Sequence, residues 1–281
     1  MNKEKIMEKV SELLDAMIVD KVDEKIVSKK YELLDKNQDG LYRIKALKDF
    51  GDVKKGDYGG YIRSEDNLSQ EGNCWIYDNA RVYGKAQVSD YAKVSGNAHV
   101  FWNAKVSGNA HVSDNAHVFW NAKVSGNAHV SDNARVYSDA KVFWNAKVSG
   151  NAQVSGKAQV SGNAHVYDNA QVFLNAHVSD NAQVSSYARV SGNAQVYGEA
   201  KISDNAQVSG DAKVYDYAKV SGNAQVSGNA QVFWNAKVSG NAKVSGEARV
   251  YGKAKIYNDA RVFLNAHVCD NAHVSGETKK D

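Results

Sequence analysis

Apolar residues recur at every sixth position between Ile76 and Val274, and this period dominates the chain. Each repeat begins with Val or Ile and carries Ala four residues later, whereas the other positions are mostly polar. The repeat at 112–117, for example, reads Val-Ser-Asp-Asn-Ala-His, and no residue is inserted or deleted between repeats. Helices repeat their apolar positions about every 3.6 residues and half-buried strands every two. An unbroken period of six therefore predicts a stacked repeat fold.

The six-residue period predicts an all-β solenoid, a single-stranded parallel β-helix in which three repeats form one coil of 18 residues. Val points inward along each flat side, and Ala fits inside near a corner. Asn is the commonest residue at the fourth position. We expect it to adopt the left-handed turn conformation, assisted by a neighbouring Gly or Asp, since the chain contains no proline. About 11 coils at the β-strand spacing give a rod on the order of 50 Å long.

Composition divides the chain into four segments: 1–29, an amphipathic helix; 30–74, a cap; 75–276, the β-helix; and 277–281, a tail. The helix, expected over 2–28, has apolar residues at three- and four-residue steps. Its polar face mixes acids and bases, which favours packing on the next domain or on a second copy over membrane binding. A cap is required because a solenoid end exposes unpaired backbone and apolar side chains.

The cap begins with a predicted β-hairpin over 30–49, followed by a glycine-rich segment, 50–74, that wraps the first coil. The hairpin turn has Asp35, Asn37, Asp39 and Gly40 at positions typical of a calcium loop. Position twelve of such a loop must be an acid, and here it is Ala46. The flanking residues resemble strands and not helices, so we predict an Asp-Gly hairpin turn.

The repeats resemble the Ile-Gly-Asp-Asn-Ala phrases of hexapeptide-repeat proteins, whose fold is a left-handed β-helix. In the cap, residues 41–47 (Leu-Tyr-Arg-Ile-Lys-Ala-Leu), 59–62 (Gly-Gly-Tyr-Ile) and 68–75 (Leu-Ser-Gln-Glu-Gly-Asn-Cys-Trp) resemble the N-terminal cap of a YdcK-like group from bacteria and phages. That group is labelled as acyltransferases by inference from fold. The resemblance covers roughly residues 30–275, and it alone implies the left-handed winding.

The resemblance implies a trimeric acyltransferase that binds acyl-CoA along a groove between two subunits. It also implies a histidine general base and a loop that extends from one coil. All eight histidines of this chain stand at the sixth repeat position, where Lys, Gln and Arg also occur, and no coil carries a loop insertion. The residues therefore favour a protein without catalytic activity, without cofactor and without a metal site. The nearest catalytic candidates are His111 and His129, one coil apart.

Residues 18 apart stack in columns, and aromatic residues gather in two of them. Aromatic pairs replace the usual Ser-Gly at several corners, where they either stabilise neighbouring strands or form an interface. We predict an interface made by Tyr83, Phe101, Trp102, Phe119, Trp120, Tyr137, Phe143, Trp144, Tyr197, Tyr215, Phe233, Trp234 and Tyr251.

One column at the sixth position contains no acid. Its cations would either bind an anionic ligand or shield an exposed β-face. Its basic members are Lys93, His111, His129, Lys147, His165, Lys201, Lys219, Lys237, Lys255 and His273. Nucleic-acid binding is not expected, because the aromatic residues lie at corners and not among these cations, and the net charge is only +3.

The sequence thus favours a non-enzymatic rod that self-associates or binds a partner through its aromatic columns. Two alternatives stay open: an acyltransferase-like enzyme, and a phage or bacterial factor that binds an anionic ligand or a host protein. The expected partners are further copies of the chain and a protein or an anionic small molecule. No run of about 20 apolar residues occurs and no signal peptide is recognised, so we expect a cytoplasmic protein with no membrane partner.

Overall fold

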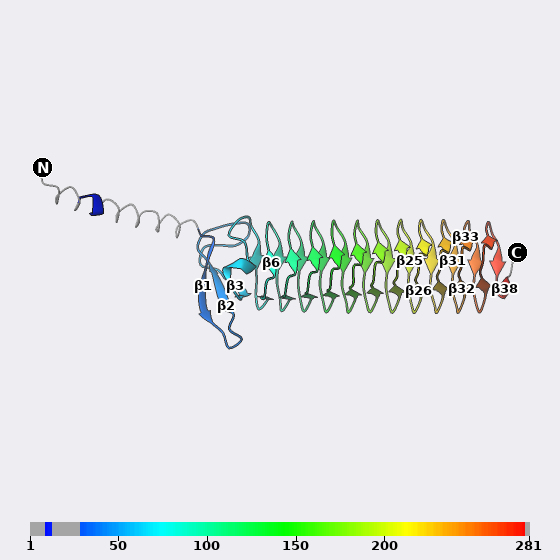
Figure 1. Ribbon diagram of the computed structural model, residues 1–281, viewed down its shortest axis with the longest axis horizontal. Helices are drawn as coiled ribbons and strands as arrows, with labels where there is room; N and C mark the ends of the chain where they lie inside the picture. The colour runs from blue at the N-terminus through cyan, green and yellow to red at the C-terminus, as the bar shows by residue number, and fades with distance from the viewer. Residues whose placement is uncertain (1–8, 13–28, 279–281) are drawn as a thin grey trace.

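The computed structural model describes residues 9–12 and 29–278, and over 29–278 it is an all-β solenoid with a capped N-terminal end (Figure 1). Its repeats form two-residue strands. The first are β4 (Trp75–Ile76), β5 (Arg81–Val82) and β6 (Gln87–Val88), and each later strand begins six residues further on, as far as β37 (His273–Val274). Each strand pairs in parallel with the strand 18 residues away, as His111 does with His129. The fold class predicted from the period is confirmed.

Every third strand joins the same sheet, so the solenoid has three faces, which we name by chain order. The first face is a 15-stranded sheet that includes β5, β8 and β11 and ends at β38 (Glu277–Thr278). The second face is an 11-stranded sheet from β6 to β36. The third face is a 12-stranded sheet from β4 to β37. Because no residue interrupts the period, the three sheets extend in register along the rod.

The interior contains the Val or Ile and the Ala of each repeat, as predicted. Val154 and Ala152, for instance, have no exposed surface. The tight corner comes from the third repeat position, where residues such as Asp114 have φ near +60°. Asn at the fourth position does not adopt this conformation. Its side chain instead donates to the Asn one coil further on, as from Asn127 Nδ2 to Asn145 Oδ1 at 3.0 Å.

The prediction for the asparagines was thus wrong about conformation. The third position carries the left-handed backbone, which Gly and Asp tolerate well. A carboxamide at the fourth position has both a donor and an acceptor. It can therefore join the coil on either side, and its repetition forms a ladder along a corner.

The cap begins with the predicted hairpin, which is confirmed. Strands β1 (Tyr31–Lys36) and β2 (Tyr42–Ala46) pair antiparallel, and β2 pairs with β3 (Tyr58–Ile62). In the turn, Asn37 Oδ1 accepts the backbone N–H groups of Asp39 and Leu41, each at 3.0 Å. This carboxamide oxygen is therefore engaged in shaping the turn.

The glycine-rich segment makes a turn of the solenoid and does not merely wrap it. Strand β3 pairs in parallel with β5 on the first face, Leu68 pairs with Val88 on the second, and β4 opens the third. A short 3₁₀ helix, η1 (Glu65–Asn67), lies between β3 and β4. The solenoid therefore has about 12 turns, one more than the repeat period indicates.

Buried side chains join the cap to the first coil. Trp75 is 1% exposed, and its ring meets those of Tyr31 and Phe50 edge-on, at centroid distances of 6.1 and 5.3 Å. The Lys30 ammonium group donates to the carbonyl oxygen of Cys74 at 3.0 Å and lies 3.2 Å from its Sγ. Burial lowers the pKa of Lys30 and raises the pKa of Cys74, since it disfavours both charged forms.

Most of the predicted N-terminal helix lies outside the described residues. The part that the structure describes, residues 9–12, is helical. Residues 279–281 of the tail are also outside them. Within the described part of the chain, no helix has the length and apolar character needed to cross a membrane.

Candidate functional site

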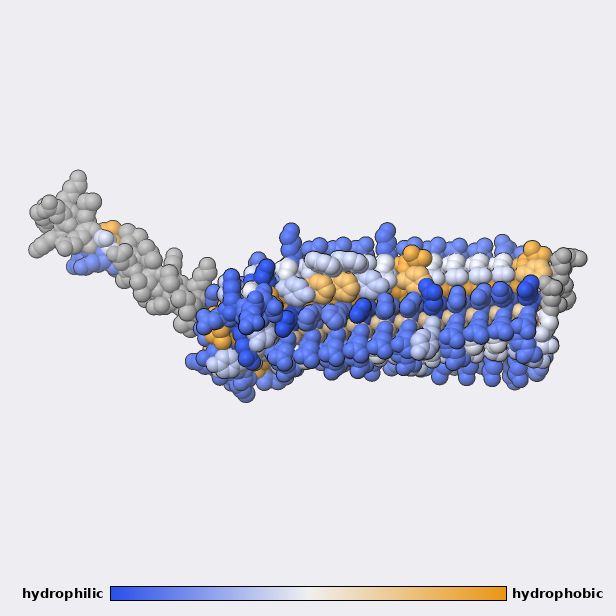
Figure 2. All heavy atoms as spheres, turned by 90° about the horizontal axis from the view of Figure 1, so that it is seen from below, coloured by the Kyte–Doolittle hydropathy of each residue, from blue (hydrophilic) through white to orange (hydrophobic). Residues whose placement is uncertain are grey.

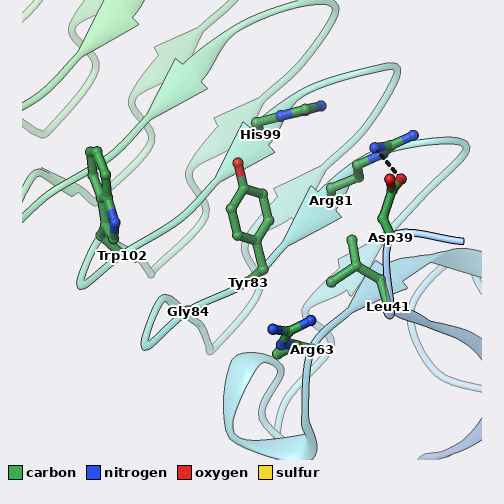
Figure 3. A pocket seen from close by; sticks show the side chains of 8 residues that line it. All are labelled: Asp39, Leu41, Arg63, Arg81, Tyr83, Gly84, His99 and Trp102. Carbon is green, nitrogen blue, oxygen red and sulfur yellow. Dashed lines mark hydrogen bonds and ion pairs between the residues drawn. The ribbon is translucent and has the colours of Figure 1, made fainter. Parts of the chain in front are cut away.

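A pocket of about 460 Å³ lies where the hairpin cap meets the first face (Figure 3). We call it the junction pocket. The cap contributes residues from the hairpin turn and from the end of β3, and the solenoid contributes residues from two successive coils. Its lining residues are Asp39, Leu41, Arg63, Arg81, Tyr83, Gly84, His99 and Trp102. Unlike the repeated surface further along the rod, this pocket combines side chains of the cap with those of the repeats.

His99 lines this pocket from strand β8 (His99–Val100), and its side chain is half-buried. Its ring lies 6.1 Å from Tyr83 and 5.1 Å from His117, measured between centroids. Burial is the main cause that lowers the pKa of His99, and the neighbouring His117 and Arg81 lower it further, whereas Asp39 opposes them. The imidazole is therefore neutral near pH 7 and able to accept a proton.

Arg81 precedes His99 by one coil and pairs with it across the first face. Its Nη1 lies 2.7 Å from Asp39 Oδ2, in an ion pair that joins the hairpin turn to the solenoid. Arg63 lines the same pocket and donates weakly from Nη1 to the carbonyl oxygen of Gly40 at 3.4 Å. Two guanidinium groups and one carboxylate leave the pocket with an excess of positive charge.

The predicted aromatic columns stack as expected from their 18-residue spacing. Tyr83, Phe101, Phe119 and Tyr137 follow one another at centroid distances of 5.0 Å and within 6° of parallel. At a second corner the stacked rings are Tyr197, Tyr215, Phe233 and Tyr251. Trp102 and Trp120 stack beside the first column at 5.4 Å. Figure 2 shows apolar side chains gathered along one edge of the rod, between rows of hydrophilic ones.

At the second corner, two phenylalanines five coils apart are each followed by a tryptophan. Phe143 and Trp144 contact each other at 5.1 Å, and Phe233 and Trp234 at 5.4 Å. The tryptophans of both pairs are more than half exposed. Both pairs lie beside the second face and are therefore remote from the junction pocket.

The acid-free column lies on the third face, where Lys201, Lys219, Lys237 and Lys255 pair in consecutive strands. An acid from the cap reaches its first member, because Asp52 Oδ2 lies 2.8 Å from Lys93 Nζ. His111 and His129 stack edge-on at 4.9 Å. The role of this column as a binding surface stays a prediction.

His129 also lines a hollow of about 480 Å³ with Lys147 and His165. Burial, and then Lys147, lower the pKa of both histidines. This hollow involves only repeat residues. Among the described residues, no three His, Cys, Asp or Glu side chains gather closely enough to hold a metal ion.

Sequence reasoning did not single out His99, because it occupies the same repeat position as seven other histidines. What distinguishes it is its distance from the cap. His99 lies one coil after Arg81, and Arg81 pairs with Asp39, which is 42 residues before Arg81 in the sequence. The sequence signal that could have identified His99 is its position in one of the first coils, which are the coils that the hairpin can reach.

Two comparisons with known proteins bear on this site. A family model described as YdcK Beta solenoid repeat matches residues 76–90 and 158–173. A protein of Escherichia coli (strain K12) named "Uncharacterized acetyltransferase YdcK" is 49% identical over 57 residues. The similar segment spans 20% of this chain and 18% of that protein, well under two thirds of either.

These similarities confirm the resemblance to the YdcK-like group. They contradict the first functional prediction, a non-enzymatic rod that associates through its aromatic columns, because the relative is named as an acetyltransferase. Each histidine shares its repeat position with Lys, Gln and Arg, and the sequence alone does not show which histidine the cap approaches. The acyltransferase alternative is the better supported.

Proposed function

We propose, from the premise that this chain carries the repeats of the YdcK β-solenoid family, that it is an acyltransferase with His99 as its general base. The observation that carries the proposal is the place of His99. It is a half-buried imidazole in a pocket formed jointly by the cap and the first coils. The donor is an acyl-CoA, and the name of the E. coli relative favours an acetyl group.

The reaction needs one base and no resident cofactor. His99 accepts the proton from a hydroxyl or amine of the acceptor while the oxygen or nitrogen attacks the thioester carbonyl carbon. The C–S bond then breaks as the ester or amide forms. The departing CoA sulfur takes the proton from the imidazolium, which returns His99 to its neutral form. A pKa lowered by burial keeps the base unprotonated at the start of this cycle.

The cap takes the part that an extended loop plays in the resembling enzymes. No repeat between Ile76 and Val274 carries a loop insertion, but Asp39 and Arg63 of the cap complete the pocket around His99. These residues make His99 a better candidate than His111 or His129, since the hollow beside His129 has no residue from the cap.

The junction pocket is large enough for the reacting end of the donor and a small acceptor. The remainder of the donor would extend outside it, in keeping with the groove between subunits that the hexapeptide-repeat resemblance implies. The proposal therefore includes a homo-oligomer, since such a groove lies between two subunits. It also includes a cytoplasmic location.

Acetyl transfer by the full chain tests the proposed function. The purified protein is incubated with acetyl-CoA and a panel of small hydroxyl and amine acceptors, and mass spectrometry follows both free CoA and the acetylated product. We expect CoA release that depends on the acceptor and matches product formation. If no acceptor raises CoA release above the level without protein, the proposed function is wrong.

The pH dependence of the transfer rate provides a second prediction. Because the pKa of His99 is lowered from 6.5, the rate should fall only once the pH drops below this lowered value. Arg81→Gln removes a cation that disfavours the imidazolium, so the pKa of His99 should rise. The acid limb of the pH–rate profile, where the rate falls with falling pH, should then move to higher pH. Asp39→Asn removes an acid that favours the imidazolium, so the limb should move to lower pH.

Rate measurements from pH 4 to 9 on the wild type and both variants check this prediction. A purely structural role for the Arg81–Asp39 pair would lower the rate in both variants and leave the two acid limbs together. Opposite displacement of the limbs requires that the titrating group lie near both charges, as His99 does.

A further inference from the structure

The third repeat position beside the first face carries two stacked tryptophans, Trp102 and Trp120, in consecutive coils. Trp120 stacks on Trp102 at 5.4 Å and within 10° of parallel. In the coil before Trp102, nearer the cap, the same repeat position is occupied by Gly84, which has no side chain. Within the described chain, the ring contacts of Trp102 are with Phe101, Phe119 and Trp120, none of them from the coil that contains Gly84.

The indole of Trp102 therefore has an open face toward the cap, and 48% of the residue is exposed. We call the space over Gly84 beside this indole the ring slot. It is part of the junction pocket, and Figure 3 shows Trp102 standing apart from Tyr83 with Gly84 between them. A flat molecule in the slot would continue this stack, as a tryptophan side chain at position 84 would.

Charge adds a second property to the slot. Arg63 and Arg81 line the same pocket, and Asp39 balances only one of them. A guanidinium group binds carboxylates and phosphates well because it offers several donors in a plane. The pocket thus presents a flat aromatic face beside an excess of positive charge.

We propose that the ring slot binds the acceptor, and that the acceptor is a ring-bearing anion whose ring stacks on Trp102 while its carboxylate or phosphate faces Arg63 and Arg81. This inference rests on the proposed function. It adds the chemical class of the molecule that receives the acyl group. An aromatic ring and a sugar ring both fit this description, since the aromatic ring stacks through its π face and the sugar ring through the C–H groups of one side.

Four small molecules separate the contributions of ring and charge. 4-Aminobenzoate is an aromatic anion with an amine, and glucosamine 6-phosphate is its sugar counterpart. 4-Aminobenzamide keeps the ring without the charge, and inorganic phosphate is an anion without a ring. Calorimetric titrations with saturating CoA present measure affinity for a site beside the donor. We expect at least one of the two ring anions to bind, and both phosphate and the uncharged amide to bind at least about tenfold more weakly.

Gly84→Trp fills the slot with the side chain that Trp102 and Trp120 carry in the same column. Gly84 has φ +66°, and those two residues have φ 57° and 58°, so the backbone conformation is one in which this column already carries tryptophan. We expect Gly84→Trp to abolish binding of the ring anion, and Trp102→Ala to weaken it about tenfold or more.

Gly210→Trp is the matched control. Gly210 stands in the same column with the same φ of +66°, between Gly192 and Gly228, and is remote from the cap. It should leave ring-anion affinity unchanged. The proposal is overturned if Gly84→Trp retains affinity, if Gly210→Trp loses it equally, if phosphate binds as well as both ring anions, or if CoA displaces the ring anion.

Binding is measured without turnover, so the slot and the proposed function can fail separately. Ring-anion binding that follows the expected pattern, without acetyl transfer to any acceptor, would refute the acyltransferase alone. Transfer that proceeds normally in the wild type, with ring-anion affinity unaffected by Gly84→Trp, would refute the slot alone.

Discussion

Replacing His99 with asparagine is expected to lower the rate of acetyl transfer about 10²–10⁴-fold, the usual contribution of a positioned general base. Asparagine keeps a polar side chain of similar size at the sixth repeat position, where Gln is common. The strand pairing of β8 should therefore be preserved. The loss should appear in kcat much more than in the affinity for acetyl-CoA, because the base acts on the acceptor proton.

His177→Asn is the matched control for this experiment. Both histidines follow Asn-Ala and precede Val, but His177 lies on the second face, in strand β21 (His177–Val178), away from the junction pocket. This control should retain the full rate and the same melting temperature as His99→Asn. His111→Asn and His129→Asn should also retain activity. A loss with either of them, and not with His99→Asn, would move the site to the third face.

The interior of the rod could be predicted from sequence because the constraint there is local and repeated. Val or Ile and Ala fill a space that is the same in every coil, as Val154 and Ala152 illustrate. The stacking of aromatic residues could be predicted as well, since an uninterrupted period fixes which residues lie 18 apart. Phe101 and Phe119 therefore stack as the sequence indicates.

The corner conformation was predicted at the wrong residue because two neighbouring positions compete for the same role. Asn tolerates the left-handed region, but so do Gly and Asp, which alternate beside it. The 18-residue spacing alone does not indicate whether the third or the fourth repeat position adopts the left-handed conformation. The Asn side chains are used instead in hydrogen bonds between coils, as from Asn145 to Asn163 at 3.1 Å.

The junction pocket could not be predicted, because it depends on where an irregular segment comes to lie on a regular one. The hairpin turn lies far from Arg81 in sequence, and their contact is a 2.7 Å ion pair between side chains. No residue pattern in the repeats indicates which side chains of the first coils the hairpin turn contacts. Geometry gives His99 its distinct environment, although its neighbours in sequence are those of an ordinary repeat.

Replacing Trp75 with alanine is expected to destabilise the cap by about 3–5 kcal/mol, the usual cost of removing a buried tryptophan side chain. Trp75 is almost fully buried and contacts Tyr31 and Phe50, so the substitution leaves a cavity between the hairpin and the first coil. In a repeat fold each unit is stabilised mainly by its neighbours. The loss should therefore be local, and the distant coils should keep their stability.

Hydrogen exchange measures this locality. Amides of β1, β2 and β3 should exchange faster in Trp75→Ala, whereas those near β30 (Gln231–Val232) should not change. Acetyl transfer should fall as well, because Asp39 and Arg63 reach the junction pocket from the cap. Trp144→Ala is the control, since Trp144 is 62% exposed and its loss should cost no more than about 0.5 kcal/mol. Equal destabilisation by both substitutions, or faster exchange spread evenly along the rod, would show that Trp75 does not hold the cap to the solenoid.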